Sequence, residues 1–292
     1  MSFQIKTATR QKLKLKIGLQ GPSGSGKTYS ALRLAHGIEN DWQKIFFIDS
    51  ENDSATYYSD IGPFKHISFS PPYSPERYIE AIDVCIDAGA TVVIIDSVSH
   101  EWEGKGGCLD IHQRETELQK YGNSFTAWAK VTPRHNAFVD HMRTSPVHII
   151  GCTRSKQDYV LEENSKGKSV PKKVGLKGVQ RDGLDYEYGL MFTIDMDHYA
   201  FSEKDRTGLF AGEPKHVISE ETGARLLTWA DKGVDEIYSA TDTQKMTLAT
   251  ICENEHEIKE RSALSEISEA LRGTPMSALG DAINKYVSER TI

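Results

Sequence analysis

The sequence predicts an α/β fold with a mostly parallel central sheet and a small helical region at its C-terminal end. Three observations support this prediction. A strand-like segment leads through a glycine-rich loop into a helical segment, two apolar runs without alternation end in acidic residues, and short helical segments begin near residue 232. Apolar runs without alternation are typical of strands that are buried on both faces of a parallel sheet.

Size and composition set the first limits. The 292 residues suffice for one large core with a small appended domain. The net charge of −7 argues against a protein that binds nucleic acid over its whole surface. The four cysteines have no CxxC spacing, so neither a zinc site nor a disulfide framework is predicted. We found no apolar run of membrane-spanning length and no hydrophobic signal core, which predicts a cytoplasmic protein.

The first strand and the loop after it predict a phosphate-binding site. Alternating leucine and isoleucine in LKLKIGLQ indicate a strand, and TYSALRLAHGIE has helical spacing. GPSGSGKT between them matches GxxxxGK[ST], whose backbone N–H groups surround phosphates; the alternative is a glycine-rich turn with a surface lysine. We expect Lys27 to neutralise the terminal phosphates of ATP and Thr28 to bind Mg²⁺. The predicted nucleotide-binding residues are Gly21, Pro22, Ser23, Gly24, Ser25, Gly26, Lys27, Thr28 and Tyr29.

Two later strands end in carboxylates. The strand at 91–95 is followed by Asp96, which would hold magnesium through water, although Asp-Ser is also a good helix N-cap. The strand at 45–48 is followed by Asp49, Ser50 and Glu51, and Glu51 is a candidate general base for hydrolysis. Glu101 and Glu103 are its rivals.

In the order GPSGSGKT, FFIDSEN and VVIIDSVS, these motifs resemble those of the RecA-like recombination ATPases. The helical segment SPPYSPERYIEAIDVCIDAGA fits the crossover helix of such a fold. The phrases SPERYIEAI, IIDSVSHEWEG and VQRDGLDYEY are similar to those of phage-encoded AAA-type or single-strand annealing members. The resemblance implies a RecA-like P-loop NTPase core, Glu51 as catalytic glutamate, and a phage protein acting in a bacterial host cell.

The resemblance also assigns a sensor strand. Val147 to Cys152 have the character of a core strand, and this strand would lie between the phosphate-loop strand and the magnesium strand. Thr153 and Arg154 at its tip are then expected to sense the γ-phosphate. The alternative is that both side chains are merely solvated.

A basic segment follows at 154–188, which we expect to be a flexible DNA-binding loop. Eight Lys or Arg stand against three acids between Arg154 and Arg181. Lysines of a flexible loop can follow a phosphate backbone, and an aromatic ring can stack on a base. The alternative is a solvated insertion. The candidate nucleic-acid residues are Lys156, Tyr159, Lys166, Lys168, Lys172, Lys173, Lys177 and Arg181. Lys105, Gly106 and Gly107 mark the position of the family's first DNA loop.

Two cations follow a predicted strand pair at 191–195 and 198–203. Lys204 and Arg206 are one residue apart, so on an extended strand they point the same way. RecA-like recombinases and hexameric helicases have such a pair, which reaches the nucleotide of the neighbouring subunit. The resemblance therefore implies catalytic roles for Lys204 and Arg206 in an oligomer, whereas the alternative is a charged β-turn.

These predictions divide the chain into an ATPase core at 1–231 and a helical domain at 232–292. The leading hypothesis is an ATPase that binds single-stranded DNA, forms a ring or filament, and supports recombination by annealing or strand pairing. A single-strand-binding protein is a further candidate partner, and no membrane is expected. The alternatives are an oligomeric helicase or helicase loader, a nucleotide-gated DNA-binding protein with little hydrolysis and, more distantly, a small-molecule phosphotransferase.

Overall fold

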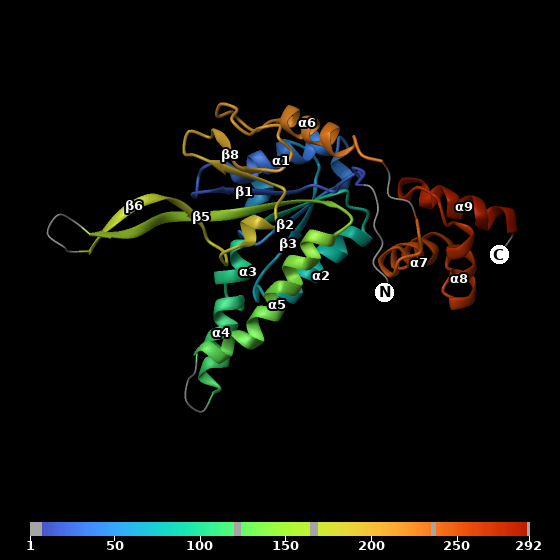
Figure 1. The fold of residues 1–292 in the computed structure, drawn as a ribbon, viewed down its shortest axis with the longest axis horizontal. Coiled ribbons are helices and arrows are strands. Elements are labelled where there is room, and N and C mark those ends of the chain that lie inside the picture. Colours follow the sequence, from blue (N-terminus) through green and yellow to red (C-terminus); the bar gives the residue numbers. More distant parts are fainter. Residues whose placement is uncertain (1–7, 120–123, 164–168, 235–237, 291–292) are drawn as a thin grey trace. The chain divides into compact units, whose positions relative to one another are not determined.

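A computed structural model describes residues 8–119, 124–163, 169–234 and 238–290 of the chain (Figure 1). The side chains of residues 157–176, 242, 243 and 290 are outside this description. The described residues fall into two compact units, one from Lys14–Trp229 and one from the two terminal segments up to Leu13 and from Ala230.

The first unit is built on a mostly parallel sheet, as the sequence predicts. Its strand order is β3-β2-β4-β5-β1-β7-β8, and only β8, and β6 against β5, are antiparallel. The bounds are β1 Lys16–Gly21, β2 Ile45–Asp49, β3 Lys65–Ser68, β4 Val92–Asp96, β5 His148–Glu163, β6 Ser169–Gly178, β7 Leu190–Ile194 and β8 Ala200–Asp205. β5 lies between β1 and β4, which confirms the predicted position of the sensor strand.

Strand register brings the acidic tips to one edge of the sheet. Asp49 is opposite Asp96, and Asp96 is opposite Cys152. All residues of β2 and β4 are buried, as expected for strands covered on both faces.

Helices cover both faces of this sheet, with α1 and α6 on one side and α2 and α5 on the other (Figure 1). α2 forms the predicted crossover between β3 and β4, and α5 precedes β5. The bounds are α1 Lys27–Ile38, α2 Pro75–Asp87, α3 Ser99–Glu103, α4 Cys108–Glu117, α5 Ser124–Thr144 and α6 Glu220–Ala230, with short 3₁₀ turns η1 Trp42–Lys44, η2 Ser54–Tyr58 and η3 Leu184–Tyr186.

Two buried polar side chains join the start of β1 to β5. His148 Nδ1 accepts the Leu15 N–H at 3.1 Å, and Lys16 Nζ donates to the carbonyls of Ser145 and Val147. Burial lowers the pKa of His148 to about 3, and the charges of Lys14 and Lys16 act in the same direction. The imidazole is therefore neutral in the folded protein.

The second unit contains α7 Asp242–His256, α8 Arg261–Ala270, η4 Met276–Ala278 and α9 Leu279–Arg290. α7 begins with a capping box, in which Thr241 and Gln244 each accept a backbone N–H of the other. Its core includes Leu248, Ile267 and Leu271, and the partly buried Ile251, Ile258 and Leu264 pack against them. In this unit the N-terminal segment pairs with the chain after α6, through a bridge between Gln11 and Val234.

Among the described helices, none combines the length and the apolar character that crossing a membrane requires.

Candidate active site

The glycine-rich loop joins β1 to α1 and has the backbone of a phosphate-binding loop. Gly24 and Gly26 have left-handed φ angles of 83° and 87°, which residues with a Cβ rarely adopt. α1 begins at Lys27 without a side-chain cap, so its first N–H groups are free to bind an anion. Lys27 Nζ donates to the carbonyls of Gly21 and Pro22, both at 2.9 Å. The Ser25 hydroxyl is buried and has no hydrogen-bond partner in the described protein.

Thr28 and Asp96 form the second part of the site. Thr28 Oγ1 donates to Asp96 Oδ2 at 2.6 Å. Burial raises the pKa of Asp96 to about 6, the Thr28 hydrogen bond acts in the opposite direction, and the charge of Glu51 adds to the rise. A hydroxyl and a carboxylate beside a phosphate loop are the oxygen donors that magnesium prefers, so these two residues fit the ion that the fold implies.

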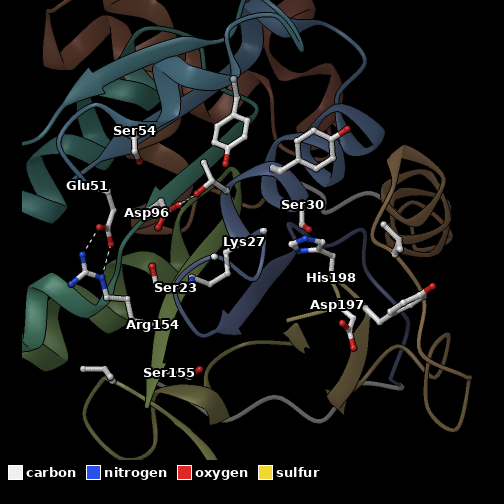
Figure 2. Close-up of a pocket in the computed structure, with 18 of the residues that line it drawn as sticks. Ser23, Lys27, Ser30, Glu51, Ser54, Asp96, Arg154, Ser155, Asp197 and His198 are labelled. Atoms are coloured by element: carbon white, nitrogen blue, oxygen red, sulfur yellow. Dashed lines mark hydrogen bonds and ion pairs between the residues drawn. The ribbon is translucent and has the colours of Figure 1, made fainter. Parts of the chain in front are cut away.

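Glu51 is positioned by the turn that follows β2. Asp49 is buried and accepts the N–H groups of Glu51 at 2.6 Å and Ala55 at 2.7 Å. The Glu51 carboxylate then faces Arg154, whose Nε donates to Oε1 at 2.7 Å and whose Nη2 donates to Oε2 (Figure 2). The site thus contains an ion pair between the predicted base and one predicted sensor.

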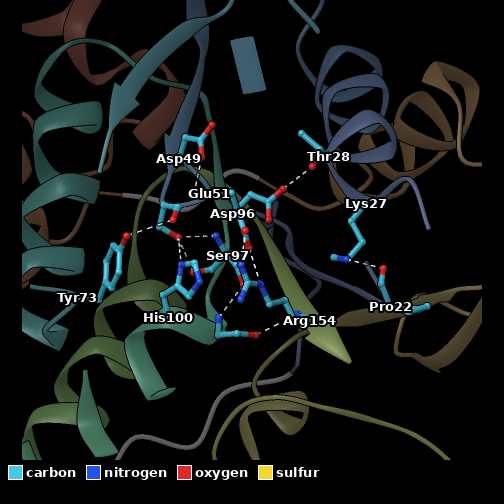
Figure 3. Close-up of polar contacts among 12 residues, drawn as sticks. Pro22, Lys27, Thr28, Asp49, Glu51, Tyr73, Asp96, Ser97, His100 and Arg154 are labelled. Carbon is cyan, nitrogen blue, oxygen red and sulfur yellow. Dashed lines mark hydrogen bonds and ion pairs between the residues drawn. The ribbon is translucent and has the colours of Figure 1, made fainter. Parts of the chain in front are cut away.

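A network of hydrogen bonds joins this turn to the residues that follow β4 (Figure 3). Ser50 Oγ accepts the Ser97 N–H at 2.8 Å and lies 2.8 Å from His100 Nδ1, which links the tips of β2 and β4. Tyr73 stacks on the His100 ring with centroids 4.9 Å apart. Burial lowers the pKa of His100, and the charge of Arg154 adds to this effect.

The rival carboxylates have different surroundings. Glu101 is fully buried and receives hydrogen bonds from His135, Cys108 and Gln180, so it is not available to a water beside the nucleotide. Glu103 is exposed and lines the same cavity as Glu51. Of the three rival glutamates, Glu51 and Glu103 therefore line the cavity, and the charge of Glu51 contributes to the raised pKa of Asp96.

These groups surround a cavity of about 1030 Å³, large enough for a nucleotide. Its wall includes the predicted Ser23, Gly24, Gly26, Lys27, Thr28 and Tyr29, together with Glu51, Asp96 and Arg154. It also includes the β7–β8 turn, where His198 Nδ1 lies 3.0 Å from the Ser25 carbonyl oxygen. The sequence interpretation treated this turn only as a strand connection, because its neighbour β1 is far away along the chain.

The two predicted sensors point to different sides of β5. Arg154 lines the nucleotide cavity, whereas Thr153 is buried and lines a second cavity of about 600 Å³ with Gln20 and Lys204. Successive side chains of a strand face opposite sides, which explains the separation.

Lys204 and Arg206 both point toward η3. Lys204 Nζ donates to the carbonyls of Asp185 at 2.9 Å and Tyr186 at 2.6 Å, and Arg206 Nη2 donates to the latter at 3.2 Å. The sequence predicted that they face the same way, and they do. Neither is among the described residues that line the nucleotide cavity of their own chain.

The predicted DNA-binding loop is largely regular, so the expectation of an irregular loop over 154–188 was wrong. β5 continues beyond the sheet and pairs with β6 to form a long two-stranded ribbon (Figure 1). The strand register pairs Lys156 with Lys177, Tyr159 with Lys173, and Val160 with Lys172. Lys177 pairs with Asp182 at 2.7 Å, and Arg181 lines the second cavity. Lys166 and Lys168 lie outside the described residues, as do the side chains of Tyr159, Lys172 and Lys173.

The stretch that resembled a first DNA loop is also more ordered than expected. Residues 108–117 form α4, and the Lys105 carbonyl accepts the Tyr73 N–H at 2.9 Å. The connection to α4 is thus short and packed against the core.

The phosphate loop, the carboxylates at neighbouring strand tips and the strand between β1 and β4 define a P-loop nucleotide-binding protein with a mostly parallel α/β core. A family model described as "AAA domain" matches residues 13–262, and the chain belongs to this family. One similar solved structure is the KaiC-like protein PH0186 from the hyperthermophilic archaeon Pyrococcus horikoshii OT3, with 14% identity over 66% of this chain and 80% of that one, and a TM-score of 0.34. No curated protein matches the sequence.

Proposed function

We propose that the protein hydrolyses ATP at the contact between two protomers, binds single-stranded DNA, and supports recombination by annealing or strand pairing. The AAA-domain family supports the ATPase part. The observation that carries the shared site is the placement of two cations: Lys204 and Arg206 lie apart from the nucleotide cavity, whereas Glu51 and Asp96 line it.

The residues of one chain supply most of the chemistry. Lys27 neutralises the terminal phosphates, and Thr28 and Asp96 would hold a magnesium ion that shields them. Glu51 accepts a proton from the water that attacks the γ-phosphorus, while the bond from that phosphorus to the bridging oxygen of ADP breaks. Arg154 reaches the same cavity and is suited to bind a γ-phosphate oxygen.

The second chain supplies the remaining positive charge. Lys204 and Arg206 contact carbonyl groups of η3 and have no acidic partner among their described hydrogen bonds. Cations held in this way are available to a phosphate of a neighbouring protomer, where they stabilise the charge of the transition state. Turnover then depends on assembly.

The DNA part of the proposal depends on the β5–β6 ribbon. It extends from the same strand that carries Arg154, so an oligonucleotide bound to the ribbon lies on the element that reaches the γ-phosphate. Its strands carry Lys156, Lys172, Lys173 and Lys177, in an otherwise acidic protein.

The test is ATP turnover with single-stranded DNA, with duplex DNA of the same length and without DNA, using Lys27→Ala as the inactive control. We expect turnover that rises several-fold with single-stranded DNA and less with duplex. Turnover that ignores DNA would remove the recombination role and leave a plain ATPase. Unwinding of a forked duplex by the protein alone would instead favour the helicase alternative.

A further inference from the structure

A second group of chemically reactive side chains lies away from the nucleotide cavity. Glu101 in α3, Cys108 in α4 and His135 in α5 offer an oxygen, a sulfur and a nitrogen that all lie within 4.8 Å of one another. Glu101 and Cys108 are fully buried, and His135 is 4% exposed. Three different donor atoms thus converge in the interior from three helices.

The local backbone is shaped to bring these helices together. The connection from α3 to α4 folds so closely that a Cβ on Gly107 would lie 2.6 Å from the Glu101 carbonyl oxygen. Stacked rings of Trp102 and Trp128, with centroids 5.6 Å apart, and the buried side chains of Ile111 and Val131 form an apolar shell around the group. Such a shell excludes water and strengthens polar interactions inside it.

Hydrogen bonds hold the carboxylate close to both of the other donors. Glu101 Oε1 lies 3.0 Å from both His135 Nδ1 and Cys108 Sγ. Zinc binds nitrogen and oxygen at about 2.0 Å and sulfur at about 2.3 Å in a tetrahedron, so its ligands stand about 3.3–3.5 Å apart. The carboxylate is therefore close to zinc-binding distance from both, and all three donor atoms lie within 4.8 Å of one another. Gln180 Nε2 donates to Glu101 Oε2 at 3.1 Å and would fix the carboxylate from outside.

Charge also favours an ion at this position. Burial and the neighbouring Glu101 carboxylate raise the pKa of the Cys108 thiol, which is protonated in the absence of a metal. A buried carboxylate without a cationic partner is costly, and the described hydrogen-bond partners of Glu101 are a thiol, an imidazole and an amide. A divalent ion with one carboxylate, one thiolate and one neutral imidazole has a net charge of zero, which removes this cost.

We propose that Glu101, Cys108 and His135 bind one zinc ion, which ties the α4–α5 pair to the end of β4. Binding releases the thiol proton of Cys108, and the three side chains supply three of the four positions of the tetrahedron. Because Glu101 is five residues after Asp96, the zinc ion would fix the segment that follows β4. The proposal is independent of DNA binding and of hydrolysis.

The experiment is metal analysis of the full chain, without a metal-affinity tag, followed by Co²⁺ titration of chelator-treated protein under reducing conditions. We expect one zinc per chain, and a thiolate-to-cobalt absorption band that zinc abolishes. Cys108→Ser and His135→Asn should lose the zinc, and Cys108→Ser should lose the band. Cys85→Ser, which changes another buried cysteine, should keep both.

A wild-type chain without zinc, and without a thiolate band when Co²⁺ is added, would overturn the proposal even if the variants fail to fold. The band also distinguishes this site from the magnesium site, because Thr28 and Asp96 contribute no sulfur.

Discussion

Arg154, within β5, and Glu51, two residues after β2, form a two-bond ion pair, with Arg154 Nε 2.7 Å from Glu51 Oε1. The guanidinium of Arg154 occupies both carboxylate oxygens of Glu51, so neither oxygen is left to accept a proton from water. The γ-phosphate of ATP offers Arg154 another anion. We therefore expect bound ATP to draw Arg154 toward the phosphate and to free Glu51 for proton transfer.

Replacement of Arg154 tests this expectation. Arg154→Ala should lower ATP turnover about 100-fold, the usual cost of one lost charge-stabilising donor, while nucleotide binding persists. Arg154→Lys keeps the charge but cannot pair through two nitrogens, so we expect an intermediate turnover. Steady-state kinetics beside equilibrium nucleotide binding separates the two effects. Wild-type turnover in Arg154→Ala would show that the pair has no catalytic role.

The two cavity-facing glutamates should differ in their effect. Glu51→Gln removes the proposed base and should lower the catalytic rate by about 10²–10⁴-fold without abolishing ATP binding. Glu103→Gln is the matched control, because its side chain lines the same cavity but is exposed. Single-turnover hydrolysis measures both. A larger loss in Glu103→Gln than in Glu51→Gln would reverse the assignment.

The ribbon should bind DNA mainly through its charge. Lys156→Ala should weaken binding of an oligonucleotide and reduce the slope of log affinity against log salt by about 0.7, the value for one phosphate contact on a single strand. Fluorescence anisotropy at several salt concentrations gives this slope. Lys259→Ala removes an exposed lysine of the second unit and serves as the control. Equal slopes in Lys156→Ala and wild type would exclude a phosphate contact at this residue.

Much of the core was predictable because its signals are local. The phosphate loop, the buried strands and the crossover helix each depend on residues adjacent in sequence. The sequence predicts a loop here because lysines, glycines and a proline interrupt β6, and Tyr159, Val160 and Leu161 form only a short apolar run. Regular pairing there depends on a partner strand that the local sequence does not specify.

Other features depend on contacts between distant residues. The sequence predicts Thr153 and Arg154 as a sensor pair, although strand alternation sends their side chains into different cavities. The cluster of Cys108 with His135 also escaped the spacing rules for cysteines, since it requires α4 and α5 to pack side by side. Only the folded chain brings such donors together.

Stability should depend on pH through His148. Its pKa is lowered in the folded protein to about 3 from an ordinary value of 6.5, so the unfolded chain binds the additional proton. The stability contributed by the neutral ring is complete above about pH 6.5 and is lost as the pH falls toward 3, by up to about 1.4 kcal/mol per pH unit.

Chemical unfolding between pH 7 and 4 measures this loss. His148→Asn keeps an acceptor for the Leu15 N–H but cannot be protonated, so its stability should fall less steeply than that of the wild type. Parallel curves for the two proteins would mean that His148 does not titrate on unfolding.

The central claim, that two chains share each nucleotide, is tested most directly by mixing two inactive proteins. Glu51→Gln lacks the base, and the double variant Lys204→Ala with Arg206→Ala lacks the cations of the neighbouring chain. Where the two proteins meet, the double variant supplies an intact Glu51, and the Glu51→Gln protein supplies intact Lys204 and Arg206. The account predicts that the mixture, with ATP and single-stranded DNA, recovers turnover well above the sum of the separate proteins. A mixture no more active than that sum, although both proteins bind ATP and assemble together, would contradict it.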